Sequence, residues 1–254
     1  MFKFIKKLKK IGAELYTTIY EYPTFKMSVI DRHIFYNFIY RHNEGHYSRN
    51  YKEWIMRRIN KILDIFEIKW FKGKRLLILG DGIGNFSPFF VELGCKVIAL
   101  EGYRNNYNIF NLRYGNLKNL EIHLFDLRND FTKFGKFDLI INFGLIEAMD
   151  EITNLLECCC KMLSKILVET LVTDSLDKKK IIKVKRGEGN DTGLNYIGSH
   201  PSPFYIEDFF ISRGFKVERH FDKDLNTPQF VYDWKHKNTG KTNERIRRFW
   251  YFYK

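Results

Sequence analysis

Three glycines at alternate positions follow a short apolar run of the sequence. The run Leu76–Leu79 precedes Gly80, Gly82 and Gly84, and each glycine removes a side chain where the chain must turn from a strand into a helix. Such a turn lets a nucleotide-bearing ligand approach the backbone. A second apolar run ends at Glu101, about 20 residues beyond the first glycine, where a carboxylate can accept hydrogen bonds from both hydroxyls of a ribose. Together these residues predict a site for an adenosine cofactor.

The spacing of the glycines distinguishes between two kinds of cofactor. A dinucleotide-binding turn carries a third small residue in a G-x-G-x-x-G pattern, and Asn85 occupies that position here. The turn is instead G-x-G-x-G, which resembles motif I of class I S-adenosylmethionine-dependent methyltransferases. The resemblance is good over residues 74–172 and looser over the C-terminal strands. It implies S-adenosylmethionine as the cofactor and an α/β fold, with a mostly parallel seven-stranded Rossmann-like sheet, helices on both faces and N-terminal helices before it.

The resemblance also assigns roles to individual residues. The three glycines would line the methionine and ribose part of the cofactor, and Glu101 would bind the ribose hydroxyls. Asp126, just past the third predicted strand, occupies the place where the family holds the adenine amino group. The backbone amide of Leu127 would face the adenine ring.

A further stretch after the fourth predicted strand resembles the part of the family that lies beside the reacting methyl group. Its sequence, FGLIE, begins at Phe143 and ends at Glu147, where the family often has G-x-L-E-H. An aromatic ring such as that of Phe143 can contact a sulfonium through cation–π attraction, and Glu147 is a candidate catalytic residue.

Two positions depart from the family pattern. Ala148 stands where the family has the histidine of G-x-L-E-H. Ile78 stands two residues before the first glycine, where the family usually has an acid. Asp81, or a residue from the N-terminal helices, is therefore a candidate substitute that would bind the methionine amino group.

Transfer of a methyl group to a hydroxyl also requires a group that takes up a proton. Histidine suits this role because its imidazole titrates near neutral pH. His200, in the sequence GSHPSP, is expected on a loop after the fifth strand, at the carboxyl edge of the sheet where such folds bind substrates. His46 lies in a polar break between N-terminal helices, where a lid could cover the cofactor. For each, the alternative is a loop residue without a catalytic role.

Short apolar runs alternate with helical segments from Arg75 onward, which indicates an α/β fold. Because the runs are continuously apolar, the pattern is typical of a parallel sheet that is covered on both faces. A helix at 206–212, a strand at 215–219 and an aromatic strand at 248–253 complete the domain. The five expected strands of the parallel sheet lie at 76–79, 96–100, 120–124, 138–141 and 166–168.

The chain divides into an N-terminal helical extension or lid at 1–70 and a methyltransferase domain at 71–254, with an insertion at 173–203 on the substrate side. Within the extension, residues 1–15 place Phe4, Leu8, Ile11 and Leu15 at helical spacing, with lysines mostly on the other faces. Such a helix can contact a membrane surface, although packing on the domain is the favoured alternative. A second helical stretch at 54–66 leads into the first strand.

The 254 residues carry a formal charge of +13, and hydrophobic residues make up 44% of them. This composition excludes a disordered chain. Three loose basic clusters, at 3–10, 178–186 and 235–248, could bind a partner, but the abundance of Lys, Asn, Ile, Phe and Tyr is also typical of A/T-rich codons. Nucleic acid is therefore a less favoured partner than a small molecule or glycan.

The four cysteines do not have metal-binding spacing, because three of them, at 158–160, are adjacent in sequence. We therefore expect no metal, and reduced thiols on a helix. The start of the chain lacks the apolar region of a secretory signal, and no apolar run approaches the length of a membrane span. These features predict a cytoplasmic location or a peripheral one at a membrane surface.

The sequence determines the methyl acceptor only in part. Enzymes that methylate the amino groups of bases resemble each other in a proline-containing motif after the fourth strand, whereas this chain has Asn142-Phe143-Gly144-Leu145. This difference disfavours base N-methylation and leaves an oxygen acceptor. The membrane-compatible N-terminal helix then favours O-methylation of a sugar, a glycan or another small-molecule hydroxyl. An RNA methyltransferase acting on a ribose or cap, and a non-catalytic cofactor-binding scaffold, remain as alternatives.

Overall fold

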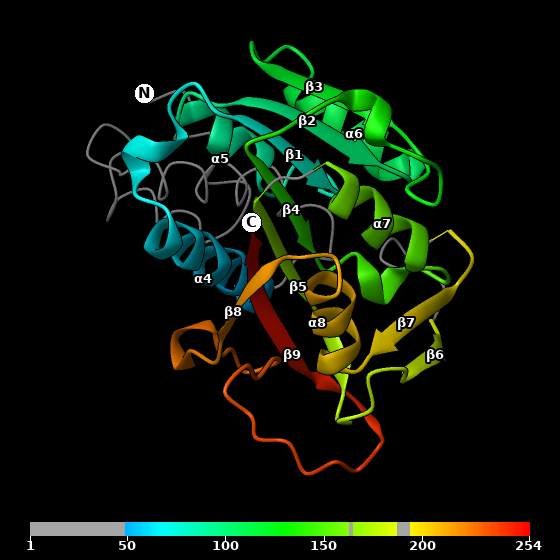
Figure 1. Cartoon of the computed structure of the whole chain (residues 1–254). Helices are drawn as coiled ribbons and strands as arrows, with labels where there is room; N and C mark the ends of the chain where they lie inside the picture. The colour runs from blue at the N-terminus through cyan, green and yellow to red at the C-terminus, as the bar shows by residue number, and fades with distance from the viewer. Residues whose placement is uncertain (1–48, 163–164, 187–193) are drawn as a thin grey trace.

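The computed structural model describes residues 49–162, 165–186 and 194–254 (Figure 1). The helices are α4 (Arg49–Ile65), α5 (Ser87–Glu92), α6 (Arg104–Tyr114), α7 (Thr153–Lys161) and α8 (Pro203–Ile211), with short 3-10 helices η2 (Ile68–Phe71), η3 (Thr132–Phe134), η4 (Ile146–Ala148) and η5 (Lys223–Leu225). The strands are β1 (Arg75–Leu79), β2 (Lys96–Glu101), β3 (Leu120–Leu124), β4 (Leu139–Phe143), β5 (Lys165–Thr173), β6 (Ile181–Lys185), β7 (Ile197–Pro201), β8 (Lys216–His220) and β9 (Thr242–Tyr253).

Seven of these strands form one sheet in the order β3-β2-β1-β4-β5-β9-β8. The first five are parallel to their neighbours, whereas β9 is antiparallel to both β5 and β8. The predicted fold class, an α/β fold with a mostly parallel seven-stranded sheet, is therefore confirmed. All five predicted parallel strands are present, and β5 extends beyond the predicted run, as far as Thr173.

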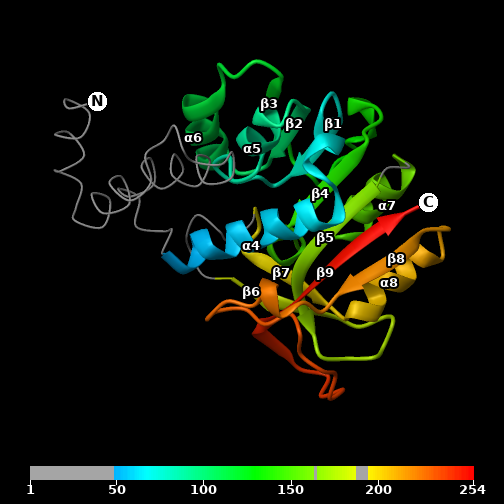
Figure 2. The ribbon, with the colours of Figure 1, turned by 90° about the vertical axis from the view of Figure 1, so that its left-hand side faces the viewer.

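Both faces of the sheet are covered, as Figures 1 and 2 show. Along β1, Leu76 and Ile78 pack into one hydrophobic core with α4, α5 and α6, while Leu77 and Leu79 pack into a second core with α7 and α8. Successive side chains of a strand point to opposite faces, so a strand buried on both faces must be apolar throughout. This explains the continuous apolar runs in the sequence.

Helix α4 packs directly on the sheet. Trp54, Ile55, Ile59 and Ile62 recur at helical spacing, and all four are buried in the core that contains β1. The helix lies across that face of the sheet in Figure 2. It therefore contributes to the same core as the strands. The expected lid residue His46 and the expected amphipathic helix at 1–15 lie outside the described residues.

The expected insertion contains regular structure that the sequence analysis did not predict. Strands β6 and β7 pair antiparallel, with Ile182 opposite His200, and form a separate two-stranded sheet. The prediction that His200 lies on a loop is therefore wrong. The strand containing it packs beside η4, and Gly198 approaches the Glu147 carbonyl so closely that any side chain there would overlap it.

The cysteines are buried and unpaired, and Cys158, Cys159 and Cys160 lie on α7 as expected. Among the described residues, no cluster of His, Cys, Asp and Glu is arranged to hold a metal ion. No helix in the described part of the chain is both long enough and apolar enough to cross a membrane.

Candidate active site

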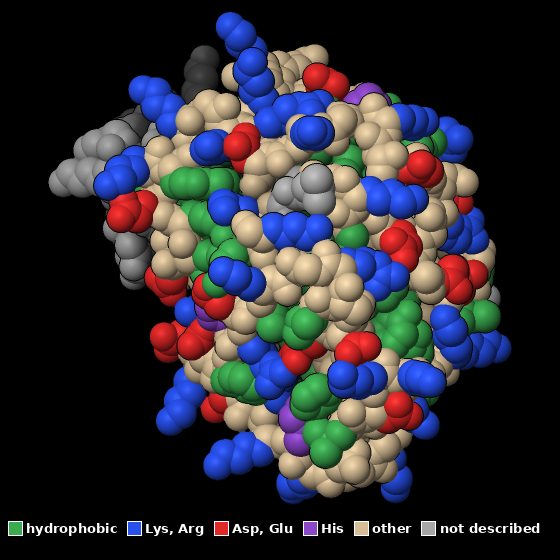
Figure 3. All heavy atoms as spheres, in the orientation of Figure 1, with side chains coloured by type: hydrophobic (Ala, Val, Ile, Leu, Met, Phe, Trp, Pro, Cys, Tyr) green, Lys and Arg blue, Asp and Glu red, His purple; other side chains and the backbone are tan. Residues whose placement is uncertain are grey.

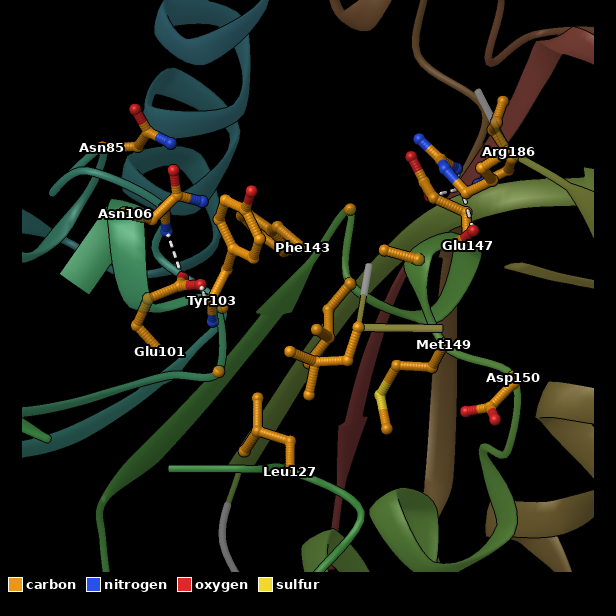
Figure 4. A pocket seen from close by; sticks show the side chains of 18 of the residues that line it. Asn85, Glu101, Tyr103, Asn106, Leu127, Phe143, Glu147, Met149, Asp150 and Arg186 are labelled. Carbon is orange, nitrogen blue, oxygen red and sulfur yellow. Dashed lines mark hydrogen bonds between the residues drawn. The ribbon is translucent and has the colours of Figure 1, made fainter. Parts of the chain in front are cut away.

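A cavity of about 490 Å³ lies at the carboxyl ends of β1, β2 and β4. Figure 4 shows its two ends. Glu101, Tyr103 and Asn106 line one end, which we call the ribose end. Glu147, Asp150 and Arg186 line the other, which we call the acceptor end. The volume is in the usual range for small-molecule sites.

The glycine turn forms part of the cavity wall. Gly80 and Gly82 both line the cavity and have positive φ angles, +67° and +63°. Only glycine adopts this backbone conformation without strain. The amide of Gly82 donates a 2.9 Å hydrogen bond to Oε2 of Glu101, which fixes the turn to the end of β2.

Two other residues of the turn have structural roles. Gly84 does not line the cavity, and a Cβ atom there would lie 2.8 Å from the rings of both Phe110 and Tyr114. Its missing side chain therefore serves packing against α6, and the assignment of Gly84 to the cofactor is not supported. Asp81 likewise does not line the cavity, because its buried carboxylate accepts hydrogen bonds from the amides of Phe86 (2.8 Å) and Ser87 (3.0 Å) at the start of α5.

Glu101 is placed as a ribose-binding carboxylate should be. It is buried in the cavity wall, where it accepts hydrogen bonds from the amides of Gly82 and Tyr103, each at 2.9 Å, and from the side chain of Asn106 (Figure 4). Burial raises the pKa of Glu101 to about 7, against the opposing effect of these hydrogen bonds. The group therefore titrates near neutral pH.

Asp126 and Leu127 also line the cavity. The side chain of Arg128 forms an ion pair with Asp126, with 2.6 Å between Nη2 and Oδ2, and this pairing lowers the pKa of Asp126. The carboxylate is thus held ionised beside the adenine position implied by the family resemblance. Leu127 is buried and supplies an apolar wall.

Phe143 lies between the two ends of the cavity (Figure 4). Its ring packs against Phe86 and Phe249 with centroid separations of 5.5 and 5.1 Å, so it is fixed by the core beneath it. The next residue, Gly144, has a φ of +67°, and its position faces Trp54, Glu147 and Arg247.

Glu147 occupies the acceptor end, where three neighbouring groups hold its carboxylate. Its carboxylate pairs with Nη2 of Arg247 at 2.7 Å and accepts hydrogen bonds from the Thr170 hydroxyl (2.8 Å) and the Leu171 amide (2.9 Å). Burial acts to raise the pKa of Glu147, but the Arg247 charge and the Leu171 amide outweigh it and hold the pKa below its usual value. A carboxylate held in this way is a weak base, so we expect Glu147 to bind the acceptor rather than to take its proton.

His200 also lines the acceptor end, from its position on β7. Its Nδ1 is hydrogen-bonded to the Thr242 hydroxyl, which leaves Nε2 as the ring nitrogen that can meet a substrate. Burial lowers the pKa of His200, as do the charges of Arg186 and Arg247, and Glu147 opposes them. These effects favour the neutral form of the imidazole.

Several residues that line the cavity, or that contact its lining from behind, were not identified from the sequence as site residues. Arg58 interrupts the apolar stripe of α4, and Glu169 interrupts the apolar run of β5, so a charged residue at a core position was the available signal. Arg247 lies on β9, far away in sequence, and no local pattern predicts its pairing with Glu147. Arg186 donates a 2.8 Å hydrogen bond to the Glu147 carbonyl.

A family model described as a methyltransferase domain matches residues 47–220, which is more than half of the chain. The chain therefore belongs to the methyltransferase domain family. A search of curated proteins finds no match.

Several solved structures share the fold. The N-terminal domain of EvdMO1, solved in the presence of SAH and D-fucose, has a TM-score of 0.61 at 16% identity, covering 83% of this chain and 85% of that one. A putative S-adenosylmethionine-dependent methyltransferase from Listeria monocytogenes has a TM-score of 0.55 at 9% identity, covering 78% and 98%. A putative RNA methyltransferase from Pyrococcus horikoshii has a TM-score of 0.51 at 18% identity, covering 81% and 84%.

The chain is an S-adenosylmethionine-dependent methyltransferase, and its own residues fit that cofactor. The buried Glu101 carboxylate suits a ribose diol, and the Gly80–Gly82 backbone allows close approach beside it. Structures of the EvdMO1 N-terminal domain have been solved with SAH.

Proposed function

We propose that this methyltransferase acts on a hydroxyl group of a sugar, a glycan or another small polyhydroxylated molecule, with His200 as the proton acceptor. The observation that carries the proposal is the placement of His200: a buried, neutral imidazole, fixed through Nδ1 by Thr242, on the wall of the acceptor end. Proton uptake is needed for a hydroxyl acceptor.

The other groups at the acceptor end support a polyhydroxylated ligand. Asp150, Glu147 and Arg186 offer both acceptors and donors of hydrogen bonds, and Phe230 adds an aromatic surface. Such a mixture suits a ring that carries several hydroxyl groups on an apolar frame. The structure of the EvdMO1 domain obtained in the presence of SAH and D-fucose supports the same acceptor class.

The bound cofactor would supply a methyl group on a sulfonium that is open to in-line attack. The residues of this chain would align the attacking oxygen and exclude water. Glu147 and Arg186 would orient the hydroxyl acceptor, Phe143 would wall the space between the two ends, and Nε2 of His200 would take the hydroxyl proton.

A nucleic-acid acceptor has less support in the described structure. Of the basic residues in 178–186, only Lys185 and Arg186 line the cavity, while Lys178 is paired with Asp208. On the face shown in Figure 3, lysines and arginines are scattered among acidic side chains. A binding surface for a phosphate backbone would instead gather its charge in one stripe.

The test is a methyl-transfer assay on a panel of sugars, nucleotide sugars and short RNAs, followed by the His200→Ala variant on the best acceptor. We expect turnover on a sugar panel member, and a fall of about 10²–10⁴-fold in kcat for His200→Ala with SAH binding retained. His123→Ala is the matched control, because His123 lies on β3 and does not line the cavity.

The pH profile provides a second readout. At saturating cofactor, wild-type kcat should fall only as the pH drops below the usual histidine range, because the pKa of His200 is lowered by burial. The His200→Ala variant should lack this limb. Turnover on RNA alone, with an affinity that falls steeply with salt, would contradict the proposed acceptor class. Normal turnover in His200→Ala would contradict the assigned base.

A further inference from the structure

Glu169 is a buried carboxylate that lies close to the cavity but does not line it. It lies on β5, is 0% exposed and is absent from the cavity wall. It nevertheless accepts hydrogen bonds from three side chains: Nε and Nη2 of Arg247, the Tyr232 hydroxyl (2.8 Å) and Nη1 of Arg58 (3.4 Å). Its role is therefore indirect, through the groups that it holds.

The two arginines held by Glu169 both line the cavity. The guanidinium of Arg58 lies 3.5 Å from the ring centroid of Trp54, and that of Arg247 lies 4.6 Å from the same ring. Arg247 is directed to the acceptor end, where it pairs with Glu147. Arg58 comes from α4, and its guanidinium lies within 4.9 Å of the Phe86 ring and 5.7 Å of the Phe143 ring. It is thus close to the end of the glycine turn.

The charges of this group balance, but the hydrogen bonds do not. Arg58 and Arg247 are neutralised by Glu147 and Glu169. Within the described residues, however, Arg58 makes one hydrogen bond, at 3.4 Å, and its buried Nε has no partner. Buried polar groups are normally satisfied, so an arginine left in this state on a cavity wall indicates a ligand that supplies acceptor oxygens.

The chemistry of the cofactor identifies those oxygens. With the ribose at Glu101, the methionine part of S-adenosylmethionine would extend past the glycine turn toward Phe143, since all three line the same cavity. That part carries the one carboxylate of the cofactor, and a guanidinium matches a carboxylate in shape and charge.

We propose that Glu169 is a positioning residue that holds Arg58 toward the carboxylate of the cofactor. Glu169 anchors Nη1 of Arg58 and the Trp54 ring stacks on the guanidinium, so Nη2 stays available to the ligand. Tyr232 completes the arrangement, since its hydroxyl accepts a 2.6 Å hydrogen bond from Trp54 and donates to Glu169. Without the carboxylate of Glu169, the buried Arg58 and Arg247 would have only Glu147 to balance their charges.

The experiment compares the binding of two ligands by calorimetry. SAH carries the carboxylate, whereas 5′-methylthioadenosine keeps the adenosine and the thioether but lacks the amino-acid part. For Glu169→Gln we expect SAH affinity to fall about tenfold or more, the scale of one hydrogen bond to a charged group, and the affinity for 5′-methylthioadenosine to change less than about twofold. Arg58→Gln should give the same selective loss.

Glu207→Gln is the matched control. Glu207 is also a buried carboxylate that pairs with an arginine, Arg219, and accepts a 2.8 Å hydrogen bond from Trp250, but neither Glu207 nor these two partners line the cavity. It should lower Tm and leave the affinity for both ligands unchanged.

Two results would overturn the proposal. An equal loss of affinity for both ligands in Glu169→Gln would mean that the residue only maintains the fold. Unchanged SAH affinity would mean that Arg58 does not bind the carboxylate. If Glu169→Gln fails to fold, the affinities of Arg58→Gln for SAH and for 5′-methylthioadenosine test the proposal instead. Because no acceptor is used, the outcome is independent of the proposed sugar substrate.

Discussion

Replacing Glu101 with glutamine would remove the charge from the ribose end while preserving the size of the side chain. In the structure, the two carboxylate oxygens face the amides of Gly82 and Tyr103. A glutamine can offer an oxygen to only one of these amides, and its NH₂ group would then face the other. The variant thus loses the charged acceptor for the ribose diol and disturbs the turn that the carboxylate holds.

The size of the effect follows from these contacts. Hydrogen bonds to a charged group contribute about 1.5–3 kcal/mol, which corresponds to a loss of about 10- to 150-fold in SAH affinity. The wild-type protein should also lose affinity as the pH falls below about 7, because burial raises the pKa of Glu101 to that value and the protonated group is a poorer acceptor. The glutamine variant should lack this dependence.

The assay is a calorimetric titration with SAH between pH 6 and pH 8.5, a range spanning the pKa of about 7 for Glu101. The histidine of the acceptor end is present in both proteins, so any contribution from its titration cancels in the comparison. A wild-type affinity that stays constant over this range, or a glutamine variant that binds SAH normally, would refute the assignment of Glu101 to the ribose.

Three further substitutions separate binding from packing. Gly82→Val should abolish SAH binding with little change in the far-ultraviolet circular dichroism spectrum, because its Cβ would strain a φ of +63° in the cavity wall. Gly84→Val should instead lower Tm, since its Cβ would lie 2.8 Å from Phe110 and Tyr114; a loss of binding with unchanged Tm would contradict this. Ile59→Ala, at a fully buried position of α4, should cost about 2–5 kcal/mol in the free energy of unfolding, and a cost near zero would show that α4 is dispensable.

The parallel strands and the glycine turn could be predicted because their determinants are local. A strand buried on both faces must be continuously apolar, and a glycine turn with an acid after the next strand places Glu101 without reference to the rest of the chain. The same local reasoning assigned Gly84 to the cofactor, although its contacts are with α6. A positive φ and a missing side chain are found both in glycines that line the cavity and in a glycine that packs against a helix, so the sequence does not distinguish the two roles.

The acceptor end was harder to predict because its residues come together from distant parts of the sequence. Arg247 meets a carboxylate 78 positions away and another 100 positions away, and no periodicity reports such pairs. His200 was expected on a loop, in the sequence GSHPSP, yet pairing with β6 places it on a strand. In both cases the tertiary contact, rather than local preference, determines the position.

The position of β9 has a consequence for synthesis of the chain. It is the last strand in sequence order, yet it lies inside the sheet, between β5 and β8. Until β9 has been synthesised, β5 is an exposed edge, and β8 has no neighbour to pair with. Arg247 is carried by the same strand, so Glu147 and Glu169 have no Arg247 partner on the nascent polypeptide. Catalytic competence and protection from edge-to-edge aggregation should therefore arise together, when β9 joins the sheet.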